Sequence, residues 1–276
     1  MGLTVGTGPF GARPSGRFNF DVDPPTGSVL FWDPVPQRIR AVFAGETVVD
    51  SSRAMLLHET GHLPVYYFPR EDLRSDVLEP SDKQTHCPHK GDASYWTVRV
   101  GDRVAEDAVW TYEDPLEPAD FLTGYVALYW AKVDEWLAEE ERLVAHPRDP
   151  YSRIDVYPTS RRVRVIVDGE VLADSERAQV LFETGLPPRY YFPAEDVRRE
   201  LFEPSEKATT CAYKGHATHW HVRVGDELHE DLAWSYAEPL RDGRPVRDLI
   251  AFYNERVDVE LDGDRSERPL TQWSPH

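Results

Sequence analysis

The sequence predicts a mainly β (α+β) protein made of two duplicated small domains of antiparallel sheets, each closed by a C-terminal helix. An internal repeat is the first observation behind this prediction. Shifting the chain by 124 residues aligns residues 38–116 with residues 162–240 without a gap, and 41 of the 79 paired positions are identical. A period this long indicates duplicated domains, because solenoid repeats run at roughly 20–50 residues.

The second observation is a series of short alternating segments within each copy, separated by turn residues. Arg38–Phe43 and Glu46–Asp50 flank Ala44-Gly45, and the second copy has Asp168-Gly169 at the matching place. A two-residue Asp-Gly loop is a strong hairpin signal, because both central residues of a type I′ turn need positive φ. We therefore expect each copy to begin with a β-hairpin.

Two further strand pairs follow in the first copy. Ala54–Glu59 and Val65–Phe68 surround the Thr60-Gly61 bend, and Tyr95–Val100 precedes Ala108–Tyr112. In the first strand of the last pair, alternation predicts a shared inward face for Trp96, Val98 and Val100. We also expect a helical first turn after Pro69, where two acidic residues would favour the positive end of the helix dipole.

A helix is expected to close each copy. The first would span Pro118–Glu141 and the second, shorter, about Val246–Arg256. Helical spacing of apolar residues supports the first of these helices: the residues are Phe121, Tyr125, Leu128, Tyr129 and Trp136.

These elements divide the chain into five segments. We expect an irregular arm over residues 1–35, a first repeat domain over 36–145, a Pro-rich linker over 146–153, a second repeat domain over 154–260 and a tail over 261–276. Because duplication imitates a dimer within one chain, we expect a monomer with an internal pseudo-two-fold.

The charge balance excludes some partners. Lys and Arg number 31 against 49 Asp and Glu, a net charge of −18 with His neutral. A field of this sign repels phosphate backbones and anionic lipid, so we expect no nucleic-acid and no membrane partner. With two cysteines and no apolar run of ~20 residues, we expect a cytoplasmic protein without a disulfide framework.

A thiol, a lysine and a glutamate recur at matched positions and are the candidate catalytic residues. A lysine three residues after a cysteine could stabilise the thiolate for nucleophilic attack, and a glutamate could act as acid or base. The alternative is a buried, inert cysteine beside a turn lysine. The residues are Cys87, Lys90 and Glu59 in the first copy and Cys211, Lys214 and Glu183 in the second.

Candidate ligand-binding residues are also paired between the copies. An arginine could bind a carboxylate or phosphate, and aromatic side chains could form the walls of a pocket. The alternatives are an ion-pair network and ordinary sheet core. These residues are Arg53, Tyr67 and Trp110, with Arg177, Tyr191 and Trp234.

No metal and no cofactor are expected. The cluster formed by His86, Cys87 and His89 is not repeated in the second copy. His219 and His221 lie on the strand face opposite Trp220, where we expect them to face solvent. The phosphate-loop spacing Gly-x-x-x-x-Gly-Lys-Ser/Thr and the Gly-x-Ser-x-Gly motif are absent from the sequence.

Taken together, the motifs resemble a bacterial family known as domain of unknown function 427. The resemblance rests on Asp-Ser-x-Arg-Ala, Glu-Thr-Gly, Tyr-Tyr-Phe-Pro-x-Glu-Asp, Glu-Pro-Ser, Cys-x-x-Lys-Gly, Trp-x-Val-Arg-Val-Gly-Asp and Trp-x-Tyr, and covers roughly four-fifths of the chain. The first copy departs from the family pattern at His89, where the family has Tyr, and the second at Ala212, where it has Pro. The resemblance implies β-tent-like domains in a tandem form. Relatives in that fold group hold zinc with two Cys-x-x-Cys units, and one cysteine per copy cannot do so.

Three functional hypotheses remain, and the sequence leaves open whether the protein is an enzyme. The first, which we rank highest, is an unknown small molecule bound in a pocket of each β domain. The second is an enzyme that uses a Cys/Lys/Glu pocket for thiol-nucleophile or transferase-type chemistry. The third is an acidic protein-interaction module.

Overall fold

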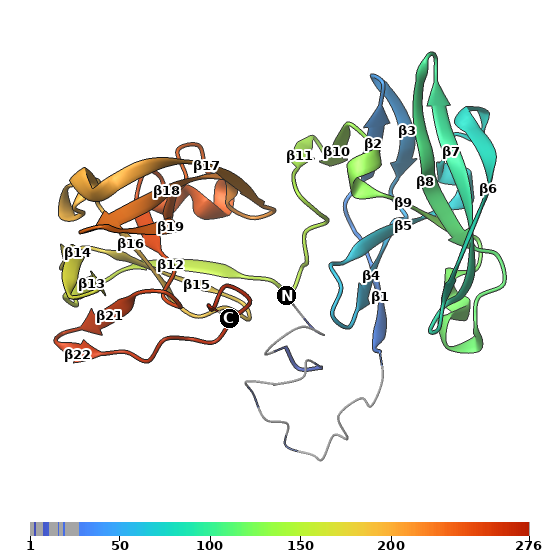
Figure 1. The fold of residues 1–276 in the computed structure, drawn as a ribbon. Coiled ribbons are helices and arrows are strands. Elements are labelled where there is room, and N and C mark those ends of the chain that lie inside the picture. Colours follow the sequence, from blue (N-terminus) through green and yellow to red (C-terminus); the bar gives the residue numbers. More distant parts are fainter. Residues whose placement is uncertain (1–2, 4–7, 11–15, 17–18, 20–27, 276) are drawn as a thin grey trace. The chain divides into compact units, whose positions relative to one another are not determined.

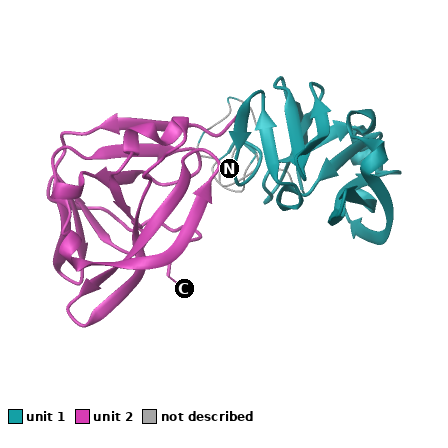
Figure 2. Ribbon diagram, turned by 90° about the horizontal axis from the view of Figure 1, so that it is seen from above, with its two compact units in different colours: residues 1–149 teal, residues 150–276 magenta. Residues whose placement is uncertain are grey.

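The computed structural model describes residues 3, 8–10, 16, 19 and 28–275. It divides into two compact units, Met1–Asp149 and Pro150–His276 (Figures 1 and 2). Each unit contains one copy of the repeat, and every pair of neighbouring strands is antiparallel. In the described part of the chain, no helix is long and apolar enough to cross a membrane.

The first unit is made of strands joined by short 3-10 turns. In chain order, the elements are β1 (Leu30–Pro34), β2 (Ile39–Phe43), β3 (Glu46–Ser51), β4 (Met55–Glu59), β5 (Val65–Pro69), η1 (Arg70–Asp72), η2 (Ser75–Val77), β6 (Leu78–Cys87), β7 (Gly91–Val100), β8 (Arg103–Tyr112), η3 (Glu117–Leu122), β9 (Tyr125–Leu128), η4 (Trp130–Lys132), β10 (Glu135–Ala138) and β11 (Glu141–Leu143).

The second unit repeats this order without a counterpart of η4. Its elements are β12 (Ile154–Pro158), β13 (Val163–Val167), β14 (Glu170–Ser175), β15 (Gln179–Glu183), β16 (Arg189–Phe192), η5 (Ala194–Asp196), η6 (Arg199–Leu201), β17 (Phe202–Cys211), β18 (Gly215–Val224), β19 (Glu227–Ser235), η7 (Arg241–Val246), β20 (Ile250–Phe252), β21 (Asp258–Leu261) and β22 (Asp264–Arg265).

Each unit pairs a seven-stranded sheet with a four-stranded one. The large sheets run β1-β4-β5-β9-β8-β7-β6 and β12-β15-β16-β20-β19-β18-β17. The small sheets run β11-β10-β2-β3 and β14-β13-β21-β22. The main core of the first unit combines residues of both sheets, among them Ile39, Phe68, Val98 and Trp136. An equivalent core includes Val163, Phe192 and Val222 in the second.

The predicted hairpin turns are confirmed. Ala44 and Gly45 have φ of 53° and 79°, and Asp168 and Gly169 have φ of 50° and 83°. Positive φ at both central residues is the type I′ geometry, whose twist matches that of the strands it joins. The turn after Pro69 is confirmed as η1.

The predicted closing helices are wrong. Pro118–Glu141 contains η3, β9, η4 and β10, and Val246–Arg256 contains β20. Gly124, at φ 82°, ends the short turn before β9. The aromatic residues then divide between two layers, because Phe121 and Tyr125 pack on the outer face of the large sheet whereas Trp136 enters the main core. The helical spacing of these aromatic residues therefore arises by chance from a succession of short strands and turns.

Parts of the predicted arm and tail form strands. β1 lies within the arm and pairs with β4, while β22 lies within the tail and pairs with β21. Most of the arm before residue 28 lies outside the described residues. β6 was not predicted, because Leu78–Cys87 is a polar edge strand without apolar alternation.

The outer face of each large sheet is also covered. In the first unit this second cluster contains Tyr67, Tyr95, Tyr112 and Leu122. The corresponding cluster of the second unit covers His219, which is 1% exposed and bonded to Thr209 at 2.9 Å. The prediction that His219 faces solvent is therefore wrong, because both faces of its strand are packed.

Candidate functional site

The Cys-x-x-Lys-Gly motif forms the turn between β6 and β7 in the first unit and between β17 and β18 in the second. The backbone N–H of Lys90 donates to the Cys87 carbonyl at 3.3 Å, and the Leu116 N–H donates to the Lys90 carbonyl at 3.1 Å. Gly91 has φ 99°, and a Cβ there would lie 3.4 Å from backbone atoms of Asp114 and Leu116. Glycine is required because of both the backbone conformation and the close approach.

The turn places a lysine against a glutamate that comes from near the opposite edge of the sheet. Lys90 Nζ bonds Glu59 Oε2 and is 8% exposed. In the second unit, Lys214 Nζ bonds Glu183 Oε2 in the same way. The pair links the β6–β7 turn to the end of β4, four strands away in the sheet order. It therefore ties the two ends of the sheet together.

Tyrosines and the cysteine surround this ion pair. Tyr67 is 2% exposed, and the Lys90 ammonium lies 6.0 Å from the Tyr112 ring centroid. Burial raises the pKa of both tyrosines above the usual range, and the nearby Glu59 and Cys87 add to the shift. The two hydroxyls therefore stay protonated near neutral pH. Cys87 is half-buried beside them.

The second unit has the same electrostatic arrangement. Burial opposes the charge of Lys214, but attraction by Glu183, Cys211 and Tyr191 outweighs it and raises the pKa of Lys214 to about 12. The structure thus brings together Cys, Lys, Glu and Tyr in both units. The catalytic role of Cys87, Lys90 and Glu59, and of their counterparts, stays a prediction.

The predicted arginines lie elsewhere. Arg53 precedes β4, at the opposite end of that strand from Glu59, and its side chain is 56% exposed. It pairs with Asp72 at 2.5 Å and Glu71 at 3.0 Å. Arg177 pairs likewise with Asp196 and Glu195. These arginines belong to surface ion pairs.

Trp110 joins the cluster to an aromatic pocket in the first unit. Its ring meets Tyr67 edge-on, with centroids 6.2 Å apart, and lies 4.5 Å from the Tyr129 ring. The pocket encloses about 310 Å³, and its aromatic walls are Tyr66, Trp110, Tyr129, Trp130 and Trp136.

The neighbouring side chains fix the geometry of these walls. Trp130 and Trp136 stack with centroids 4.9 Å apart and planes 9° apart. The indole N–H of Trp136 donates to the Trp130 carbonyl at 3.1 Å. His146 also lines the pocket, and burial lowers its pKa. The imidazole is therefore neutral near pH 7.

Sequence reasoning found Trp110 but missed the other four rings. Tyr129 and Trp136 were assigned to the face of a helix that does not form, and Trp130 received no role. Differences between the copies are the signal that identifies Trp130 and Trp136. The second unit has Asn254 at the position of Trp130, and Val259 pairs with Val165 where Trp136 pairs with Ala41.

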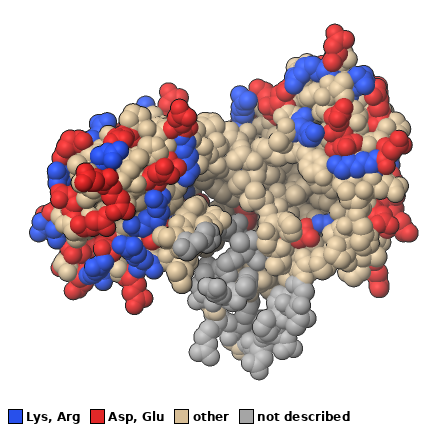
Figure 3. All heavy atoms as spheres, viewed as in Figure 1, with Lys and Arg blue, Asp and Glu red and all other residues tan. Residues whose placement is uncertain are grey.

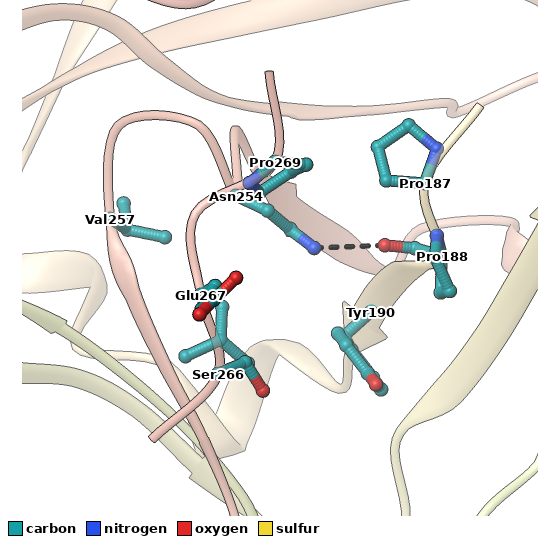
Figure 4. A pocket seen from close by; sticks show the side chains of 9 residues that line it. Pro187, Pro188, Tyr190, Asn254, Val257, Ser266, Glu267 and Pro269 are labelled. Carbon is teal, nitrogen blue, oxygen red and sulfur yellow. Dashed lines mark hydrogen bonds between the residues drawn. The ribbon is translucent and has the colours of Figure 1, made fainter. Parts of the chain in front are cut away.

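The second unit has a smaller pocket at the same place in the fold. It encloses about 210 Å³ between Pro187, Pro188, Tyr190 and tail residues including Pro269 (Figure 4). The Asn254 side chain donates to the Pro188 carbonyl at 2.8 Å, as the dashed line in Figure 4 shows. Trp234 and Tyr253, the counterparts of Trp110 and Tyr129, do not line it.

One group in the described residues has the spacing of metal ligands. Ligand atoms of Asp168, Glu227 and His229 lie within 4.8 Å of one another. The first unit has Ala44, Arg103 and Ala105 at these positions. Both acids are exposed, and exposed acidic groups are common without a metal, so we assign none.

A comparison with protein-family models matched both copies of the repeat. A family model described as a domain of unknown function (DUF427) matches residues 32–139 and again residues 155–263. No curated protein matches the chain.

Proposed function

The chain belongs to the DUF427 family as a tandem pair of domains, and we propose that its first unit binds a small molecule in the aromatic pocket. The observation that carries this proposal is a concave, ring-lined cavity of about 310 Å³. Ligand sites are clefts of roughly 300–1,000 Å³, lined mainly by apolar and aromatic side chains.

Exposure of the rings distinguishes the first pocket from ordinary core. Tyr129 is 39% exposed, and Trp110 is half-buried, whereas Trp234 is 7% exposed. Leu63, at the pocket wall, is 56% exposed. Leaving several large apolar groups together in water is costly, so a cluster of this kind marks an interaction site.

The eight tryptophans of the chain provide a direct test. We would label the protein with 5-fluorotryptophan and titrate it with neutral, cationic and anionic aromatic fragments while recording ¹⁹F spectra. The proposal expects saturable shifts of the Trp110, Trp130 and Trp136 signals. Trp110→Phe should weaken binding, whereas the matched variant Trp234→Phe in the second unit should not.

The absence of any saturable shift at the three first-unit signals, with all fragment classes, would contradict the proposal. Equal weakening by Trp110→Phe and Trp234→Phe would also contradict it, since it would show that the response does not report the first pocket.

A further inference from the structure

The second unit holds a cation of its own among the rings that correspond to the first pocket. The Arg189 guanidinium lies 5.9 Å from the ring centroids of Trp234 and Tyr253, and 5.6 Å from that of Trp273 in the tail. Such distances allow a cation–π interaction, in which the ring quadrupole attracts the positive charge.

A buried carboxylate completes this internal site. Arg189 and Glu255 form two parallel hydrogen bonds of 2.7 and 2.6 Å, and the residues are 5% and 2% exposed. Thr271 of the tail also donates to Glu255 at 2.5 Å. The guanidinium, its carboxylate and the Trp273 ring therefore occupy the space beside Trp234 and Tyr253.

The first unit lacks both charged groups at the matching positions. Val65 replaces Arg189, and Ala131 replaces Glu255. The strand register supports this match, because Ala127 faces Tyr67 as Ala251 faces Tyr191. Trp110 and Tyr129 are retained, and Trp130 and Trp136 add two more rings. Among the described residues that line it, the first pocket thus has an aromatic cage and no Lys or Arg.

We propose that the first-unit pocket takes an organic cation of the quaternary ammonium class, which supplies the charge that Arg189 supplies in the second unit. This inference rests on the proposed function and specifies its ligand. A quaternary ammonium has no N–H groups, so it needs no hydrogen-bond partner such as Glu255 when it enters an apolar cage.

The electrostatics of the chain favour the same class. The net charge is −18, and a negative field raises the local concentration of cations. In the view of Figure 3, acidic side chains lie among basic ones on both units. Lys83 Nζ is 5.8 Å from the Tyr129 ring, but Asp107 lies 3.6 Å away and offsets its charge.

The experiment compares two probes of equal shape. Choline and its neutral isostere 3,3-dimethylbutan-1-ol would be titrated against the fluorotryptophan-labelled full chain. We expect choline to bind about tenfold more tightly, as ~1.4 kcal/mol of cation–π stabilisation implies. The shifts should appear at Trp110, Trp130 and Trp136.

Two variants connect the effect to the cage. Val65→Arg/Ala131→Glu installs the second unit's ion pair and should abolish choline binding. Should that variant not fold, the probe comparison on the unaltered chain still decides, and Trp130→Asn provides a milder change that should weaken choline binding several-fold.

Equal or tighter binding of the neutral isostere would overturn the cation inference and leave small-molecule binding intact. No response to choline while neutral fragments bind would have the same meaning. If neither probe and none of the fragments shifted the ¹⁹F signals, the proposed function itself would be contradicted.

Discussion

The two units share a scaffold but differ at the pocket. Both tie the ends of the large sheet together with a Lys–Glu pair, Lys90–Glu59 in one and Lys214–Glu183 in the other. Around the pocket, by contrast, the first unit has Val65 at the position where the second unit has Arg189. The comparison indicates that residues retained between the copies mainly build the fold, and that those which diverged determine the size and the lining of the pocket.

The largest effect should come from breaking the shared tie. Lys90→Met removes the cation that neutralises Glu59, whose side chain is only 13% exposed, and we expect a loss of about 3 kcal/mol in the free energy of unfolding. Lys90→Met/Glu59→Leu should recover most of it, because the carboxylate is then removed together with the ammonium group. Urea unfolding followed by tryptophan fluorescence measures both variants.

Arg53→Ala is the matched control for the tie. Its ion pairs are exposed, so we expect a change within about 1 kcal/mol. If Lys90→Met cost no more than Arg53→Ala, the buried pair would not be a structural tie, and its retention in both copies would favour the catalytic hypothesis.

Alkaline pH tests the same tie in the second unit. The pKa of Lys214 is raised from 10.5 to about 12, so its stabilisation is complete below pH 10.5 and is lost as the pH rises through 12. The shift corresponds to about 2 kcal/mol. We expect this part of the pH dependence to vanish in Lys214→Met/Glu183→Leu, as measured by urea unfolding between pH 9 and 12. An unchanged dependence in the double variant would refute the assignment.

A smaller effect should follow from uncovering the second unit's rings. Trp273→Ala removes one ring from the Arg189 guanidinium, at a cost of about 1 kcal/mol. The solvent isotope shift of the Trp234 ¹⁹F signal should rise toward that of Trp110. A Trp234 signal that stayed shielded from solvent would show that the tail does not cover this site.

Much of the fold was predictable because its signals are local. The Asp168-Gly169 turn and the alternation around Val98 depend on residues adjacent in the chain. The helix predicted over Pro118–Glu141 failed because its aromatic spacing reflects two separate layers. β6 has no alternation of apolar residues, so its local sequence does not predict a strand.

The candidate site was predictable in part for a related reason. Short motifs identified Lys90 and Glu59, although nothing in the sequence indicates that they meet across the sheet. Arg53 was predicted to line the pocket but lies in a surface ion pair. The sequence does not reveal this, because its partners Glu71 and Asp72 belong to a turn that comes later in the chain. The pocket depends on Trp130 and Trp136, whose positions are set by tertiary packing.

The most direct test of the difference between the units exchanges their pocket residues. One chain would carry Val65→Arg/Ala131→Glu in the first unit and Arg189→Val/Glu255→Ala/Trp273→Ala in the second. Titrated with choline and observed by ¹⁹F NMR, this chain should show no shifts at Trp110. Shifts should appear at Trp234, at choline concentrations several-fold higher than the unaltered first unit needs, because Asn254 and Val259 replace two rings of the cage. Shifts that stayed at Trp110, or that vanished from both units while both remained folded, would contradict the account.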